Sequence, residues 1–323
     1  MSLSEIAARY RRFATKEAAG HSPFYEAAAL AVAKDAGLLA KLATLPEGKQ
    51  QPNLLFASLR HRFGLADEVA SFLAPTREAW PAVSTVMLAR STQTNEPGRC
   101  ATLLPLLARL PQPLALLEVG ASAGLCLLPD HYGYDYRIGE ARYRLLPPDA
   151  GPDTPIFPCE VSPDTPLPER LPQVIWRAGL DLNPLDLGDR ASAAWLETLV
   201  WPEQRARAQG LHQAIAVARE NPPRVIAGDL NRDLAALAAE APREATLVIF
   251  HSAVLAYLSP EARQRFRKEV QAMDAIWISN EAESVLGMKA PATARDDLLF
   301  VTLQDTIPLA RADPHGRRLH WIG

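Results

Sequence analysis

The sequence predicts an α/β protein with a doubly wound, mostly parallel sheet of about six or seven strands behind an all-helical N-terminal region. Two observations lead to this fold class. Up to about Arg99 apolar residues recur at helical spacing, whereas later short apolar runs alternate with helical stretches. Such alternation is typical of βαβ units and a parallel sheet. With 323 residues the chain is long enough for both regions, which we place at 1–99 and 100–323.

The N-terminal region is expected to contain a series of short helices. Its first apolar stripe consists of Ile6, Ala7, Tyr10, Phe13 and Ala14. Gly20 is typical of a residue just after a helix, and Ser22-Pro23 of an N-cap followed by a first helical residue. We expect Gly37 to end that second helix. Further helices are predicted at 54–64, 68–74 and 82–90.

The second region contains the apolar runs that we interpret as core strands. They lie at 114–119, 174–180, 224–230, 246–252 and 275–281. Helical stretches between the later runs cover 206–220 and 259–273. The runs at 298–304 and 318–323 predict two more strands, one of them antiparallel.

Residues 132–173 interrupt this alternation and form an insertion between the first and second core strands. Nine prolines fall between Pro147 and Pro172. The segments YDYRIG and ARYRLL precede them and predict a small hairpin, which an extended proline-rich excursion follows.

Composition excludes some classes of function and favours a cytoplasmic protein. The formal net charge of −3 provides no broad basic field, so we expect neither general nucleic-acid binding nor membrane binding. Cys100, Cys126 and Cys159 are too widely spaced for a Cys-x-x-Cys metal clip, and no signal-peptide block precedes the helices. His315 and His320 lack metal-ligand spacing, so no metal site is predicted.

The segment LALLEVGASAGLCLLP, at 114–129, is the one in which we expect chemistry. It has the form of a strand, a Gly-rich turn and a helix. Gly120 can adopt a left-handed turn, Gly124 lets a following helix approach closely, and free N–H groups of that helix could bind a carboxylate or another anion. Glu118 places an acceptor for an ammonium group at the end of the strand.

This segment resembles the first motif of class I S-adenosylmethionine-dependent methyltransferases, with Ser122 at the position where many members have the middle glycine. The resemblance implies a Rossmann-like fold and S-adenosylmethionine as cofactor. The cofactor-binding residues that it implies are Glu118, Gly120, Ala121, Ser122, Gly124, Asp181, Asp229 and Leu230. Asp181 corresponds to the ribose-binding acid and Asp229 to the acid that holds the adenine amino group. His251, after the fourth strand, is the candidate catalytic base.

Two features depart from the methyltransferase pattern. Asp181 follows Gly120 by 61 residues, whereas about 20 is usual in a dinucleotide-binding fold, so the insertion must account for the excess. Asp135 has more ordinary spacing and is the alternative ribose-binding acid, although no apolar strand precedes it. The fourth strand also begins without the acid that many methyltransferases have there.

A wider resemblance covers residues 54–322. The phrases TNEPGRCATLLP, EVGASAGL, RAGLDLNPLD, VWPEQ, GDL and DPHGR are similar to an uncharacterised bacterial family of the DUF2332 type. That resemblance implies no reaction. Within TNEPGR, the side chains of Asn95, Glu96 and Arg99 are interpreted either as a surface turn or as a lid that contacts cofactor or substrate.

The sequence leaves three functions open. The first is a methyltransferase acting on a small molecule or a protein. The second is a serine hydrolase, because GASAG is formally a G-x-S-x-G elbow and chain order allows a triad of Ser122, Asp229 and His315. The third is a non-catalytic module with a methyltransferase-like core. The acceptor and the oligomeric state cannot be read from the sequence.

Overall fold

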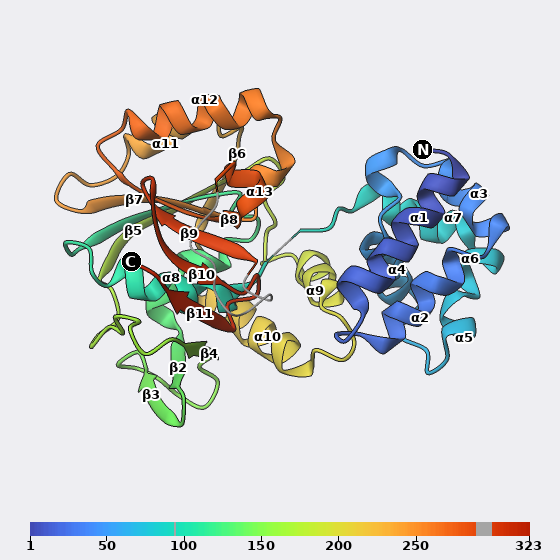
Figure 1. The fold of residues 1–323 in the computed structure, drawn as a ribbon, viewed down its shortest axis with the longest axis horizontal. Helices are drawn as coiled ribbons and strands as arrows, with labels where there is room; N and C mark the ends of the chain where they lie inside the picture. The colour runs from blue at the N-terminus through green and yellow to red at the C-terminus, as the bar shows by residue number, and fades with distance from the viewer. Residues whose placement is uncertain (94, 289–298) are drawn as a thin grey trace. The chain divides into compact units, whose positions relative to one another are not determined.

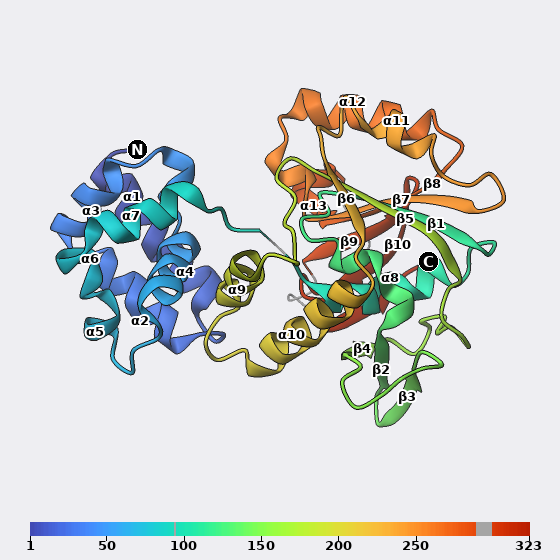
Figure 2. The same ribbon diagram turned by 180° about the vertical axis from the view of Figure 1, so that it is seen from behind.

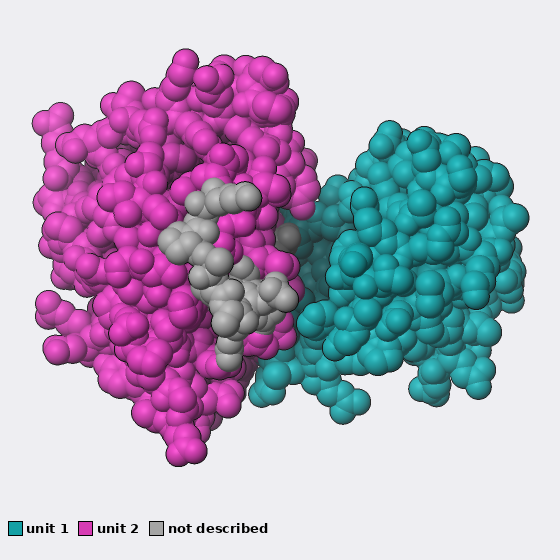
Figure 3. Space-filling view, viewed as in Figure 1, with its two compact units in different colours: residues 1–93, 189–209 teal, residues 94–188, 210–323 magenta. Residues whose placement is uncertain are grey.

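The computed structural model describes residues 1–93, 95–288 and 299–323. The chain divides into two compact units, which Figure 3 shows in different colours. One unit joins 1–93 with 189–209, and the other joins 94–188 with 210–323. Residues 95–99, which lie before the boundary predicted from the sequence, therefore group with the second unit.

The first unit is built of helices (Figure 1). They are α1 (Leu3–Phe13), the π-helix η1 (Ala14–Ala18), α2 (Pro23–Val32), α3 (Ala36–Ala43), η2 (Glu47–Lys49), α4 (Pro52–Phe63), α5 (Val69–Leu73), α6 (Pro75–Glu78), α7 (Trp80–Ala89) and α9 (Arg190–Leu199). The predicted apolar stripe of the first helix is buried throughout. It packs with Phe56 of α4 and Trp195 of α9 in one hydrophobic core.

Capping explains where the second helix starts and why the third is separate. The Ser22 side chain accepts a hydrogen bond from Tyr25 N, and Pro23 is the first helical residue, as predicted. The prediction that Gly37 ends this helix is wrong, because α2 already ends at Val32. The Asp35 carboxylate accepts from Leu38 N and starts α3, which contains Gly37.

The second unit contains one large mixed sheet. Its strands are β1 (Leu114–Val119), β2 (Gly133–Ile138), β3 (Ala141–Leu145), β4 (Ile156–Val161), β5 (Val174–Asp181), β6 (Arg224–Ala227), β7 (Thr246–Ser252), β8 (Ile276–Ala282), β9 (Phe300–Gln304), β10 (Ile307–Ala312) and β11 (Arg318–Trp321). They are ordered β3-β2-β4-β11-β10-β9-β8-β7-β1-β5-β6. In the described residues the sheet thus has eleven strands, more than the six or seven predicted, and six of its ten pairings are parallel.

Helices cover both faces of this sheet. The helices of the second unit are α8 (Cys100–Leu107), α10 (Arg205–Glu220), whose residues 205–209 belong to the first unit, α11 (Leu234–Ala238), α12 (Pro260–Gln271) and α13 (Glu283–Leu286). Figures 1 and 2 show α11 and α12 on one side of the parallel strands and α8 on the other. Leu234 of α11 and Phe266 of α12 share a core with Leu117 of β1 and Ile249 of β7. The prediction of a mixed α/β unit with a large, mostly parallel sheet is confirmed.

The insertion at 132–173 belongs to the sheet. Its predicted hairpin is present as β2 and β3. The proline-rich part contains β4, a strand that the sequence did not predict, and β4 pairs in parallel with both β2 and β11. The predicted strand at 298–304 begins with Leu298, which lies outside the described residues, and β9 covers its later part.

Candidate functional site

The candidate site lies where the order of the parallel strands reverses. From β1 the chain proceeds to β5 and β6 on one side, and later to β7 and β8 on the other. Ligands of open α/β sheets bind outside the carboxyl ends of the strands at such a point. Glu118 lies near that end of β1, and Asp181 and Ser252 are the last residues of β5 and β7.

Backbone strain is concentrated in the two loops that flank this point. In the turn after β1, Gly120 and Gly124 have φ of +71° and +72°, and Ser122 has φ of +52°. Ala253, directly after β7, has φ of +59°. Among the described residues, Asp305 is the only other non-glycine residue with positive φ. Strained residues of this kind tend to cluster at functional sites, so the strain supports a ligand site here.

The amides of the turn after β1 are hydrogen-bonded within the protein. Ser122 N donates to Asp181 Oδ2 at 2.8 Å, Ala123 N to Asn95 Oδ1 at 3.0 Å, and Gly124 N to Ala121 O at 2.7 Å. The turn leads into the short 3-10 helices η4 (Leu125–Leu127) and η5 (Pro129–His131). The predicted helix with free N–H groups is replaced by these two short 3-10 helices, and the amides of the turn do not form an anion site.

Glu118 is the least satisfied charged group of the site. Its side chain is buried, 7% exposed, and Oε2 has no hydrogen-bond partner in the described part of the chain. Burial raises the pKa of this carboxyl well above its usual value, Cys126 and Asp181 add to the rise, and Arg99 opposes it. A cationic group placed beside Oε2 would satisfy this oxygen and favour its ionised form.

A buried segment, which we call the strap (residues 95–99), crosses this region. Asn95 Nδ2 donates to Ser122 Oγ at 2.7 Å, and its Oδ1 accepts from Ala123 N. Arg99 Nη1 donates to Ser252 O at 3.0 Å. The strap residues Asn95, Glu96 and Arg99 are each at most 8% exposed, so they do not form a surface turn. Thr94, which precedes the strap in the TNEPGR phrase, lies outside the described residues.

The two later carboxylates lie at the ends of neighbouring strands. Asp181 Oδ1 accepts from Asn183 N, while its Oδ2 holds the turn as described. Asp229 follows β6, and its Oδ1 accepts from Asn231 N, which is the geometry of a local cap. Leu230 is buried in the core beside α11.

Asp135, the alternative ribose-binding acid, lies elsewhere. It is on β2, seven places from β1 in the order of strands, and its carboxylate pairs with Arg142 on the hairpin. The segment between Gly120 and Asp181 includes β2, β3 and β4, while β5 itself returns beside β1. The insertion thus accounts for the long spacing, and of the two acids only Asp181 contacts the turn.

His251 is the last residue but one of β7 and has no exposed surface. Its Nδ1 is 2.9 Å from Glu281 Oε1, an oxygen that also accepts from Val254 N and Leu255 N. Burial alone would raise the pKa of Glu281, but the hydrogen bonds from these three donors and the charge of His251 lower it overall. The pair therefore holds the loop in place. His251 Nε2 has no hydrogen-bond partner among the described residues, and the ring is fully buried, so the role of His251 as a base stays a prediction.

Sequence reasoning missed Glu281 and its neighbour Asn280. Asn280 Nδ2 donates to Ser252 Oγ at 2.9 Å, and Thr302 Oγ1 donates to Asn280 Oδ1. The signal was the polar phrase Ser-Asn-Glu at the end of an apolar strand. Because these three side chains are almost fully buried, they form a polar layer that positions the carboxyl end of β7.

The residues of the predicted hydrolase triad bond to different partners. Ser122 Oγ accepts from Asn95, the Asp229 carboxylate accepts from a backbone amide, and His315 Nδ1 is 3.2 Å from Glu96 Oε2. No hydrogen bond joins two triad members within the described residues.

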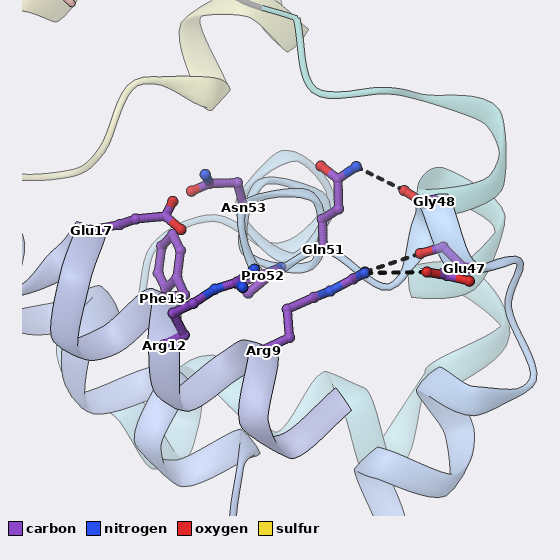
Figure 4. Close-up of a pocket in the computed structure, with 9 residues that line it drawn as sticks. All are labelled: Arg9, Arg12, Phe13, Glu17, Glu47, Gly48, Gln51, Pro52 and Asn53. Carbon is purple, nitrogen blue, oxygen red and sulfur yellow. Dashed lines mark hydrogen bonds and ion pairs between the residues drawn. The ribbon is translucent and has the colours of Figure 1, made fainter. Parts of the chain in front are cut away.

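A separate hollow of about 420 Å³ lies in the helical unit (Figure 4). Its walls are formed by Arg9, Arg12, Phe13, Glu17, Glu47, Gly48, Gln51, Pro52 and Asn53. Arg9 donates to Glu47 O and lies 3.7 Å from the Glu47 carboxylate. This hollow shares no residue with the site at the strand reversal.

Comparison with protein families matches the chain, over residues 7–321, to the model described as "Uncharacterized protein conserved in bacteria (DUF2332)". The chain belongs to the DUF2332 family. No curated protein and no solved structure matches this DUF2332 chain. None of its described helices is both long and apolar enough to cross a membrane. Its described residues also include no group of three or more His, Cys, Asp or Glu side chains arranged to hold a metal ion.

Proposed function

We propose that this chain is an S-adenosylmethionine-dependent methyltransferase whose cofactor binds at the strand reversal. The observation that carries the proposal is the buried Glu118 carboxylate, whose Oε2 lacks a partner at the end of the first parallel strand. A cofactor with an ammonium group supplies the donor and the charge that this oxygen lacks. The strand order β6-β5-β1-β7-β8, with β1 at the reversal, supports a Rossmann-like arrangement.

Asp181, Asp229 and Leu230 are also compatible with a bound cofactor. Each Asp181 oxygen accepts one backbone hydrogen bond, and a carboxylate has about four acceptor positions, so Asp181 retains capacity for ribose hydroxyls. Asp229 and Leu230 lie after the next strand, where they would contact the adenine. When bound, S-adenosylmethionine supplies an activated methyl group. The protein then has to align an acceptor and exclude water.

Isothermal titration calorimetry with S-adenosylmethionine and S-adenosylhomocysteine tests the proposal on the full chain. We expect the wild type to bind both, and Glu118→Gln to bind about 10- to 150-fold more weakly, since a charge-assisted hydrogen bond is lost. Glu140→Gln removes an exposed carboxylate of the β2–β3 turn and should bind as the wild type does. Absence of binding by the wild type would overturn the proposal.

Substitution of Gly124 is a poor probe of the same site. A Cβ at this position would lie 2.7 Å from Pro223 Cγ and 2.9 Å from Val225 Cγ2. Gly124→Val should therefore disturb the packing of the turn whether or not a cofactor binds. Ser122→Ala is more informative. The Ser122 Oγ is already hydrogen-bonded to Asn95 within the protein, so its loss should change cofactor affinity little.

One observation favours the hydrolase alternative, namely the positive φ of Ser122, which nucleophile elbows share. A fluorophosphonate probe distinguishes the two functions. Covalent labelling of wild type but not of Ser122→Ala, without binding of S-adenosylmethionine, would replace the methyltransferase with a serine hydrolase. Binding of the cofactor without turnover of any acceptor would instead indicate a non-catalytic binding module.

We further propose that the acceptor is a small molecule or a protein and that the reaction takes place in the cytoplasm. The net charge of −3 argues against a bulk nucleic-acid substrate, and the three described cysteines are all free thiols, as a reducing compartment favours.

A further inference from the structure

The proposed function gives no role to two segments of the sequence, the strap at 95–99 and the phrase DPHGR at 313–317. These two segments are in contact in the structure. The loop between β10 and β11, residues 313–317, packs directly on the strap. Arg99 Nε donates to Pro314 O at 2.8 Å. Gly316 has φ of +77°, and a Cβ there would lie 2.0 Å from Gly98 O, so only glycine allows this approach. The Asp313 carboxylate accepts from His315 N and pairs with Arg317, which fixes the loop.

This contact brings a histidine and a carboxylate together. His315 Nδ1 lies 3.2 Å from Oε2 of Glu96, whose side chain is only 5% exposed, whereas the imidazole is 32% exposed. Because a carboxylate accepts, neutral His315 carries its proton on Nδ1 and keeps a lone pair on Nε2. In the described residues Nε2 has no hydrogen-bond partner, and part of the ring faces solvent.

The strap connects this pair to the candidate site. Asn95, adjacent to Glu96, holds Ser122 Oγ and Ala123 N of the turn after β1. Arg99 holds Ser252 O at the end of β7 and also acts on the charge of Glu118. The pair is therefore fixed to both loops of the strand reversal. It is also accessible, unlike His251.

We propose that His315 is the general base of this site and that Glu96 is its positioning residue. Nε2 accepts the proton of an O–H or N–H group of the acceptor. That bond breaks with its electron pair left on the acceptor atom, which becomes the nucleophile, and a new Nε2–H bond forms. Glu96 holds Nδ1–H and stabilises the imidazolium. The assignment of this base to methyl transfer rests on the proposed function.

Imidazole ¹⁵N NMR of the full chain tests the pair itself, with the His315 signals assigned from His315→Gln. We expect wild-type His315 to be protonated on Nδ1 and unprotonated on Nε2 at neutral charge. In Glu96→Gln this preference should shift toward Nε2–H, while Glu140→Gln should leave it unchanged. A wild-type His315 protonated on Nε2 would overturn the assignment.

Carbethoxylation by diethylpyrocarbonate, followed by peptide mass spectrometry, measures the reactivity of Nε2. His315 should be modified in the folded chain, and about three- to tenfold more slowly in Glu96→Gln. Exposed His21 in the helical unit should react equally in both proteins, and buried His251 should be protected in both. Protection of wild-type His315, or equal rates in both proteins, would contradict an accessible base that Glu96 positions.

Titration of the NMR sample with S-adenosylhomocysteine separates this inference from the proposed function. We expect the His315 signals to shift and those of His21 to remain. If calorimetry shows binding but the His315 signals do not move, the pair does not belong to the cofactor site and the inference is wrong. If calorimetry shows no binding, the proposed function fails, and the role of His315 as a base for methyl transfer fails with it. The tautomer and the reactivity of His315 still test whether Glu96 positions the imidazole.

Discussion

At the scale of single residues, Glu118 shows the conflict between stability and binding most clearly. Its carboxyl is buried beside Cys126 and Asp181, and Arg99 supplies an opposing charge. A buried polar atom without a partner destabilises a fold, so the residue is unfavourable unless a ligand completes it. Residues that break a local rule in this way are expected at functional sites.

Glu118→Gln should therefore stabilise the protein while it weakens cofactor binding. The pKa of this carboxyl is raised on folding, so wild-type stability falls as pH rises from the unfolded pKa, near 4.5, through the folded pKa. The variant lacks this titration, and its melting temperature should exceed that of the wild type more at pH 8 than at pH 5. Each kcal/mol corresponds to about 2 to 4 °C. Scanning calorimetry measures the effect, and an equal or lower melting temperature at pH 8 would contradict it.

At the scale of elements, the turn after β1 and the loop after β7 fit together through one glycine. A Cβ on Gly120 would lie 2.4 Å from Val254 Cγ2. Val254 N donates a hydrogen bond to the Glu281 carboxylate of β8. Glu281 therefore fixes the position of the Val254 side chain that packs on the turn. The two strained non-glycine residues, Ser122 and Ala253, lie in these same two loops.

Gly120→Ala should lower the free energy of unfolding by about 2 to 5 kcal/mol, from the left-handed conformation and the clash together. Gly139→Ala is the matched control. Gly139 also has positive φ but open space around its Cβ, so the cost should be only about 1 to 2 kcal/mol. Adding Val254→Ala should recover part of the loss in Gly120→Ala. Denaturant unfolding measures the free energy of unfolding of these variants and of Val254→Ala alone. If the changes in the two single variants simply add up in the double variant, Val254 is not the obstacle.

At the scale of the whole molecule, the chain leaves the helical unit, forms strands β1 to β5 of the sheet, and returns to the helical unit at 189–209. The returning segment supplies Trp195, which is 1% exposed in the helical core and donates from Nε1 to Ser91 O at 3.0 Å. A segment that follows β5 in the sequence thus stabilises helices at the start of the chain.

Trp195→Ala should destabilise the helical unit by about 3 to 5 kcal/mol, since it removes a buried aromatic side chain. Hydrogen exchange followed by mass spectrometry should show faster exchange in peptides of α1 and α4, with β1 and β7 unchanged. Leu65→Ala, which removes a half-exposed side chain of the same unit, should stay within about 0.5 kcal/mol of the wild type. Equal acceleration of β1 and β7 would show that the two units do not unfold separately.

Features encoded by local pattern could be predicted from the sequence. The bounds of β1 and β7 agree with the predicted runs, because a buried parallel strand is a continuous apolar segment between polar ends. The stripe of α1 and the cap of α2 were predicted for the same reason. At the site, Glu118 and Asp181 were placed correctly at the carboxyl ends of neighbouring strands, because parallel strands end at one edge. Their roles as cofactor ligands remain predictions.

The sequence by itself thus determined the class of the fold, its core strands and the position of the Gly-rich turn. Tertiary structure alone decided that β4 and β11 pair, that the turn leads into short 3-10 helices, and that His251 is buried. It alone brought Glu96 to His315 across 219 residues. The physical reason is range. Periodicity and caps arise between residues a few positions apart, whereas these pairings depend on contacts between distant segments and leave no repeating pattern in the chain.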